Sequence, residues 1–281
     1  MGWRLRIEHT TRIRYAGQVL TSFNEARMTP LTLPTQETLE ARVTICPGHV
    51  PAWAYTDSWG TRVTVFDLHQ AHDALLIRAT STVQTRPLEQ PAGTLSWNAI
   101  ARAAAESGLR EFRRPTPLTA LDPEIAGAAI AGVREQSPRE AAEAISAQVR
   151  HRIAFMPGAT GVRTGAREAW DKGQGVCQDL AHVTVALLRA AGLPARYVSG
   201  YLHPDPKAEP GSTATGQSHA WAEYWAGEWA PLDPTHGVPV AERHVVVARG
   251  RDYNDVPPLK GVYRGSPHRD MEVAVVVTKL A

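Results

Sequence analysis

Apolar and polar side chains alternate through the first third of the chain. Within residues 4–83 the apolar positions recur at every second residue, as in Leu5 with Ile7 and Val63 with Val65. A period of two is typical of a half-buried β-strand, because successive side chains of a strand point to opposite faces of its sheet. The pattern predicts an all-β, sandwich-like N-terminal domain of about eight short strands.

The alternation ends in a segment that favours neither strands nor helices. Residues 85–93 hold two prolines and a glycine, which interrupt regular backbone hydrogen bonding. We therefore expect a β-rich N-terminal domain over residues 1–86 and a second domain over residues 94–281. The second domain begins with alanine-rich sequence, and its predicted helices cover residues 95–107, 122–135 and 138 to about 153.

A cysteine lies where a glycine-rich turn becomes a helix. Residues 173–177 read Gly-Gln-Gly-Val-Cys, and the apolar residues after Cys177 recur at helical spacing until Gly192 ends the run. Cys177 is thus expected in a first helical turn, where unpaired N–H groups and the positive end of the helix dipole stabilise a thiolate. The same N–H groups can hold an oxyanion. These features make Cys177 a candidate nucleophile.

Two later segments contain the groups that a nucleophilic cysteine needs. His219 lies in Ser-His-Ala-Trp and Asp233 in Leu-Asp-Pro-Thr, and both segments read as strands. Cys177 precedes His219 by 42 residues (219 − 177), and His219 precedes Asp233 by 14 (233 − 219). These spacings allow a helix, a strand, a loop and a neighbouring strand. We predict a catalytic triad in which His219 is the base and Asp233 orients it.

These segments resemble the bacterial branch of the transglutaminase-like (papain-like cysteine) superfamily. The resemblance implies a papain-like α+β core, in which a helix that begins with the nucleophile packs on an antiparallel β-sheet. It implies the same roles for Cys177, His219 and Asp233, and it extends to an N-terminal region found in that branch. The residues that carry the resemblance are 15–27, 175–179, 192–201, 218–221, 233–235 and 250–265.

The chemistry expected of such a triad is acyl transfer at an amide bond through a thioester. Water as the acyl acceptor makes the protein a cysteine protease or amidase, whereas an amine makes it a transglutaminase. The resemblance favours hydrolysis of a peptide or protein substrate, because this branch is usually described as cysteine proteases. A protein that keeps the fold as an inert binding module is the remaining alternative, and three chemically matched groups argue against it.

Composition excludes several classes of protein. The net charge of the 281 residues is +2 and charged residues make up 21%, so we expect no nucleic-acid or membrane-surface partner. The two cysteines, Cys46 and Cys177, exclude a disulfide framework. No signal peptide or apolar run of about 18 residues is visible, which makes the cytoplasm the expected location. The oligomeric state stays open.

Several other residues have simpler interpretations than catalysis. Cys46 lies in an apolar run, so we expect a buried strand residue. His182 follows Cys177 by five residues and faces another direction, which favours a core role. Asp179 suits a first turn whatever the function. His69 and His72 lack further ligands at zinc spacing, and we predict no metal and no cofactor.

Two features near His219 bear on the substrate. Residues 203–217 contain three prolines and two glycines, and we expect a mobile loop beside the site. Four aromatic residues could line a substrate groove or pack against the core, and the sequence does not decide between these two roles. They are Trp221, Tyr224, Trp225 and Trp229.

Overall fold

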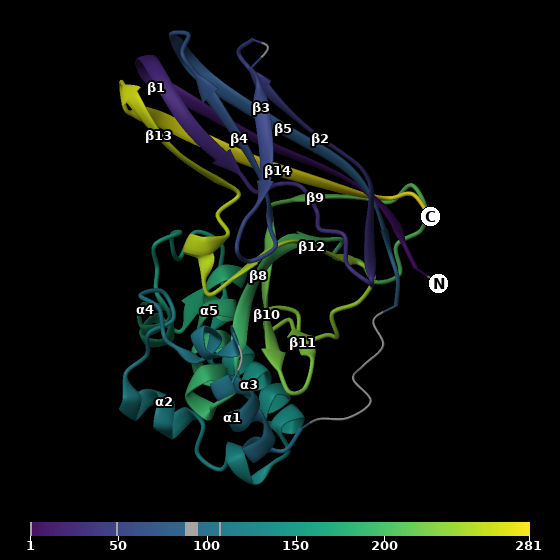
Figure 1. Cartoon of the computed structure of the whole chain (residues 1–281), viewed down its shortest axis with the longest axis vertical. Helices are drawn as coiled ribbons and strands as arrows, with labels where there is room; N and C mark the ends of the chain where they lie inside the picture. Colours follow the sequence, from purple (N-terminus) through teal and green to yellow (C-terminus); the bar gives the residue numbers. More distant parts are fainter. Residues whose placement is uncertain (1, 49, 88–94, 107) are drawn as a thin grey trace.

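The structure is a computed structural model that describes residues 2–48, 50–87, 95–106 and 108–281. A large curled sheet of long strands forms one half of the molecule, and helices around a smaller sheet form the other (Figure 1). The two ends of the chain meet, because the Arg4 N–H donates to the Ala281 carbonyl at 2.8 Å. The expected domain boundary at 85–93 lies largely outside the described residues.

The large sheet is built along β1 (Arg4–Ala26), which runs its full length. The first half of β1 pairs antiparallel with β5 (His72–Thr85) and β14 (His268–Lys279), and its second half pairs with β4 (Arg62–Leu68) and β13 (Leu259–Gly265). The change of partners coincides with register irregularities, which bend a strand and curl its sheet. The other strands of this sheet are β2 (Gln36–Cys46), β3 (Ala52–Thr56) and β9 (Thr213–Gly216).

The strand-rich N-terminal region is confirmed, but its architecture differs from the prediction. Its strands are longer than expected and form one curled sheet of eight strands within the described residues, where we predicted a sandwich of short strands. Three of these strands come from residues 213–279. A period of two identifies strands but not their partners, so the sequence pattern could not show that the end of the chain returns to β1. The division at residues 86 and 94 stays a prediction.

A smaller antiparallel sheet forms the centre of the second half. Its strand order is β11-β10-β8-β12, and helix α5 (Cys177–Ala191) packs against β10 and β8. This is the expected papain-like core. The strands are β8 (Ala195–Leu202), β10 (His219–Trp225), β11 (Trp229–Leu232) and β12 (His244–Gly250).

Further helices surround α5 and bury its apolar residues. Leu180 and Leu187 of α5 share a buried cluster with Ile145 of α3. The helix predicted over 122–135 is shorter than expected: it ends at Ala129 with Ile130 as its C-cap, and Gly132, with a left-handed backbone (φ 74°), begins a separate 3-10 turn over Val133–Glu135. No helix of the described chain is long and apolar enough to cross a membrane. The surrounding helices are α1 (Trp97–Glu106), α2 (Pro123–Ala129), α3 (Pro138–Arg152) and α4 (Ala166–Lys172).

The two halves share a hydrophobic core. Leu5 and Val83 of the large sheet pack in one buried cluster with Tyr197 and Val245 of the small sheet. The segment 203–217, expected to be a mobile loop, contains β9, which pairs with β14. Strand pairing at this position attaches residues 213–216 to the large sheet, so this part of the segment is a strand and not a loop.

Candidate active site

Cys177 is the first residue of α5, as predicted. The chain reaches it through the two-residue strand β7 (Gln174–Gly175), which pairs in parallel with β6 (Ala154–Phe155). The Met156 N–H also donates to the Gly175 carbonyl at 2.8 Å. The backbone just before Cys177 is therefore held in place by its pairing with residues 154–156, and the thiol is half-buried.

Asp179 stabilises the start of this helix. Its carboxylate is 1% exposed and accepts the N–H of Val176 at 2.8 Å and the hydroxyl of Thr160. Burial raises the pKa of Asp179, although both hydrogen bonds lower it. The predicted structural role of Asp179 agrees with these bonds.

The first turn of α5 presents donors beside the thiol. The first backbone N–H groups of a helix have no partner inside the helix. In α5 these include the N–H groups of Cys177 and Gln178. The N–H of the preceding residue, Val176, donates to the Asp179 carboxylate instead. The two remaining groups can stabilise a negative oxygen on a carbon bonded to the sulfur.

His219 begins β10 and is buried at 7% exposure. Its register partner is Gly200 of β8, where an added Cβ would lie 2.7 Å from the Trp221 ring and 2.1 Å from the Val245 carbonyl oxygen. Glycine at this position lets Trp221 pack closely. The Trp221 ring in turn stacks on the His219 imidazole at 5.8 Å between centroids, which restricts the orientation of the base.

The electrostatic surroundings keep His219 protonated near neutral pH. Burial alone lowers the pKa of His219, but hydrogen bonds with Asp233 and Cys177 and the charges of both outweigh it and raise the pKa to about 9. A protonated imidazole stabilises a thiolate beside it. The pair can therefore provide both a nucleophile and a proton for the leaving group.

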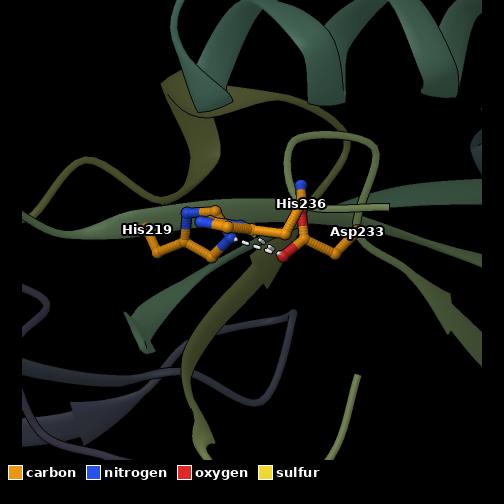
Figure 2. Close-up of side chains that lie close together, drawn as sticks. All are labelled: His219, Asp233 and His236. Atoms are coloured by element: carbon orange, nitrogen blue, oxygen red, sulfur yellow. Dashed lines mark hydrogen bonds and ion pairs between the residues drawn. The ribbon is translucent and has the colours of Figure 1, made fainter. Parts of the chain in front are cut away.

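Asp233 follows β11 and is 3% exposed. Three imidazole nitrogens surround its Oδ2 atom: His219 Nε2 at 2.9 Å and His236 Nδ1 at 3.0 Å, both drawn in Figure 2, and His244 Nε2 at 3.3 Å. Its Oδ1 atom accepts the N–H of Thr235 at 2.9 Å. Burial raises the pKa of Asp233, but the hydrogen bonds from the histidines hold it far below its usual range. Asp233 is thus an anion that orients His219.

The sequence reasoning missed His236 and His244. His236 lies three residues after Asp233, where a local side-chain contact could have been considered. His244 begins β12, and only the strand order places it near Asp233. Its Nδ1 atom accepts the Ala241 N–H at 3.2 Å, so its Nε2 atom carries the proton that it donates to Asp233.

The other candidates fall outside this cluster. His182 is fully buried, as a core role predicts, and its Nε2 atom accepts the N–H of Tyr253 at 3.1 Å. Cys46 is exposed, so the prediction of burial was wrong. It is the last residue of β2, which pairs only with β5 among the described strands, and an edge strand leaves its end open to solvent.

The aromatic residues near His219 mainly pack. Trp221 is completely buried, and the Trp229 ring is covered by the Arg196 guanidinium at 3.9 Å. Trp225 packs against the helical core. These contacts favour the core role over the substrate groove.

Sequence families match both halves of the chain. Residues 127–234 match the transglutaminase-like superfamily, and residues 5–84 match the bacterial transglutaminase-like N-terminal region. The chain belongs to the transglutaminase-like superfamily. The first match includes the predicted triad residues Cys177, His219 and Asp233, and the second covers most of the strand-rich region.

Relatives of this transglutaminase-like protein include sequences and solved structures. An uncharacterized protein of Mycobacterium leprae is 39% identical over 279 residues, which cover 99% of this chain and all of the relative. A structure described as a "Putative Cysteine Protease from Cytophaga hutchinsonii" has a TM-score of 0.78 at 20% identity, covers 100% of this chain and 92% of its own, and shows the shared fold. A protein-glutamine gamma-glutamyltransferase of Pseudomonas aeruginosa is 35% identical over 129 residues, 42% of this chain and 19% of that protein.

Proposed function

We propose that the protein is a cysteine-dependent acyl-transfer enzyme that hydrolyses peptide or other amide bonds through Cys177, His219 and Asp233. The observation that carries the proposal is the convergence of these groups. Cys177 lies in the first turn of α5, the His219 Nε2 atom lies 2.9 Å from the Asp233 carboxylate, and the Cys177 thiol is among the groups that raise the pKa of His219.

The arrangement supports a two-step reaction. The Cys177 sulfur attacks the carbonyl carbon of the amide, and the oxygen takes up the negative charge beside the first N–H groups of α5. His219 gives its proton to the departing amine, and a thioester remains on the sulfur. His219 then takes a proton from water, which attacks the thioester and releases the acid and the thiolate.

The packing of the aromatic residues supports water as the acceptor. An amine must compete with water at about 55 M, so a transglutaminase needs a site that binds and orients the amine. Trp221 and Trp229 could have formed such a site, but burial and the Arg196 contact occupy them. Transfer to an amine is the second candidate, because a protein-glutamine gamma-glutamyltransferase matches 42% of the chain.

Product analysis separates the two acceptors. Incubation with a peptide library and mass spectrometry of the intact protein should first reveal an acyl adduct on Cys177. The peptide that forms this adduct is then offered with a lysine-like amine at millimolar concentration, and both products are quantified. We expect mainly the acid. Mainly amine adduct would establish transglutamination, and no adduct on Cys177 from any peptide would contradict the proposed enzyme.

A further inference from the structure

Three side-chain atoms that can bind a metal lie close together around Asp233. His219 Nε2, Asp233 Oδ2 and His236 Nδ1 all lie within 4.8 Å of one another. Figure 2 shows both imidazole rings directed at the same carboxylate from different segments of the chain. No metal was predicted from the sequence, where only His69 and His72 were considered as ligands; the ligand atoms found here come from β10 and from the segment after β11.

The spacing of these atoms approaches that of a tetrahedral metal site. The two nitrogens lie 2.9 and 3.0 Å from the carboxylate oxygen. A zinc ion with bonds of about 2.0 to 2.2 Å holds its ligand atoms roughly 3.3 to 3.5 Å apart. Binding of an ion therefore requires each imidazole to move away from the Asp233 oxygen by about 0.3 to 0.6 Å, and His236, whose side chain is 37% exposed, has the most room to move.

The donor set selects the kind of ion. Two imidazoles and one carboxylate suit Zn²⁺ and its neighbours Co²⁺ and Ni²⁺, whereas Mg²⁺ and Ca²⁺ prefer oxygen ligands. Three protein ligands leave a fourth position for water. The carboxylate is already oriented by further hydrogen bonds, from His244 to Oδ2 at 3.3 Å and from the Thr235 N–H to Oδ1 at 2.9 Å, the kind of support that ligands of metal sites receive.

A triad of cysteine, histidine and aspartate does not need His236. The pair His219–Asp233 offers two ligand atoms, and His236 adds the third from the solvent side. The positive charge of Arg243 acts on Asp233 and opposes a cation there. We therefore expect exchangeable binding and not a permanent structural ion.

We propose that His219, Asp233 and His236 form a site for a zinc-like divalent ion that reversibly switches the enzyme off. Binding requires the lone pairs of His219 Nε2 and His236 Nδ1, so each atom gives up its proton to solvent or to the other nitrogen of its ring. The ion then takes the place of the hydrogen bond between His219 and Asp233. The site rests on geometry alone, whereas the inhibitory effect rests on the proposed function.

Cobalt provides a measurement that does not depend on activity. The full chain is titrated with Co²⁺, and visible absorption of the tetrahedral ion gives the affinity and stoichiometry. We expect one equivalent in the wild type, displaced by Zn²⁺. His236→Ala and His236→Gln should each weaken binding at least tenfold, while His268→Ala, which removes an exposed imidazole on the large sheet, should leave it unchanged. Equal binding by wild type and both His236 variants would overturn the site.

A second variant separates this site from simple capture of the thiol. Cys177→Ala removes the sulfur and should keep the affinity for Co²⁺ within about twofold. Loss of binding in this variant would mean that the thiol holds the ion, and the proposed site would be wrong. Because Cys177→Ala has no turnover to measure, this result is independent of the proposed function.

The regulatory part is tested on a substrate found by acyl trapping. Zn²⁺ should abolish turnover of the wild type, a chelator should restore it, and the concentration for half inhibition should rise at least tenfold in His236→Gln. Inhibition that is equal in both proteins would overturn the switch. Binding of Co²⁺ by a protein that turns over no peptide would instead keep the site and remove the proposed function.

Discussion

Two buried carboxylates lie on the small sheet, and their partners differ. Asp233 is surrounded by three histidines at the end of β11. Glu223 of β10 is bound by two arginines, with Arg196 Nε at 2.6 Å and Arg249 Nη2 at 3.0 Å. Both side chains are nearly inaccessible, at 3% and 5% exposure, so each anion depends on its partners for charge compensation.

The partners decide what each anion can do. Burial raises the pKa of Glu223, but the arginines outweigh it and lower the pKa below its ordinary value, and an arginine does not release its proton in the working range. The Glu223 cluster therefore fixes the geometry of β8, β10 and β12. A histidine can exchange its proton near neutrality, so the Asp233 cluster can support a reaction.

The largest expected effect is the loss of catalysis when Asp233 loses its charge. Asp233→Asn keeps the shape and still offers an amide oxygen to the His219 Nε2–H, but it lacks the negative charge that stabilises a protonated His219, so kcat should fall by roughly 10³-fold or more. Cys177→Ala and His219→Ala should abolish turnover. Steady-state kinetics on the trapped peptide measure the change, and Asp270→Asn, an exposed carboxylate paired with Arg14, is the control. Wild-type kcat in Asp233→Asn would show that another group orients His219.

Glu223 should affect stability more than chemistry. Glu223→Gln leaves Arg196 and Arg249 buried without an anion, and breaking a buried pair of this kind costs about 3 to 5 kcal/mol. Urea unfolding at pH 7 measures the free energy, and the folded variant should keep most of its kcat. The control is Glu143→Gln, an exposed partner of Arg139, which should change the free energy by less than about 1 kcal/mol. Equal effects of the two substitutions would contradict the comparison.

The sequence predicted the local structure around Cys177, His219 and Asp233 well, because each lies in a short motif with local meaning. The glycine turn and the apolar spacing after Cys177 place it at a helix start, and the strand residues around His219 and Asp233 read correctly. The resemblance and the family match agree on this region. The papain-like core could therefore be predicted before any contact was known.

The surroundings of these groups could not be predicted in the same way. His244 reaches Asp233 only through the order of the strands, which places β12 beside β8. The large sheet also depends on pairing between distant segments, since β14 lies beside β1 at the other end of the chain. Alternation of side chains shows which face of a strand is apolar, but it does not specify the neighbouring strand. The burial of Cys46 was predicted wrongly for the same reason, because its edge position follows from pairing.

His182 is a third buried ionisable group, and within the described residues its ring nitrogens bind no carboxylate. Burial, with a contribution from the charge of Arg189, lowers the pKa of His182 to about 3. Its Nε2 atom accepts the Tyr253 N–H, and its ring packs at 4.9 Å from Tyr197. His219 has comparable burial, but its carboxylate raises its pKa. The difference between the two histidines comes from the hydrogen bonds and charges of Asp233 and Cys177 beside His219.

The neutral state of His182 predicts a loss of stability in acid. The folded protein holds this imidazole without a proton, whereas the unfolded chain binds one below its pKa of 6.5. Stability from this residue is complete above pH 6.5 and falls as the pH drops from 6.5 toward 3, at about 1.4 kcal/mol per pH unit. Between pH 7 and pH 5 the loss should be about 2 kcal/mol.

Urea unfolding at pH 7 and pH 5 tests this expectation. The quantity compared between proteins is the change in the free energy of unfolding between the two pH values. His182→Gln keeps an acceptor for the Tyr253 N–H but does not titrate, so its free energy of unfolding should fall by about 2 kcal/mol less than that of the wild type. His268→Gln, at an exposed position, should follow the wild type. If His182→Gln loses as much stability as the wild type, His182 does not contribute to the acid sensitivity, and burial without a carboxylate is not what sets its charge.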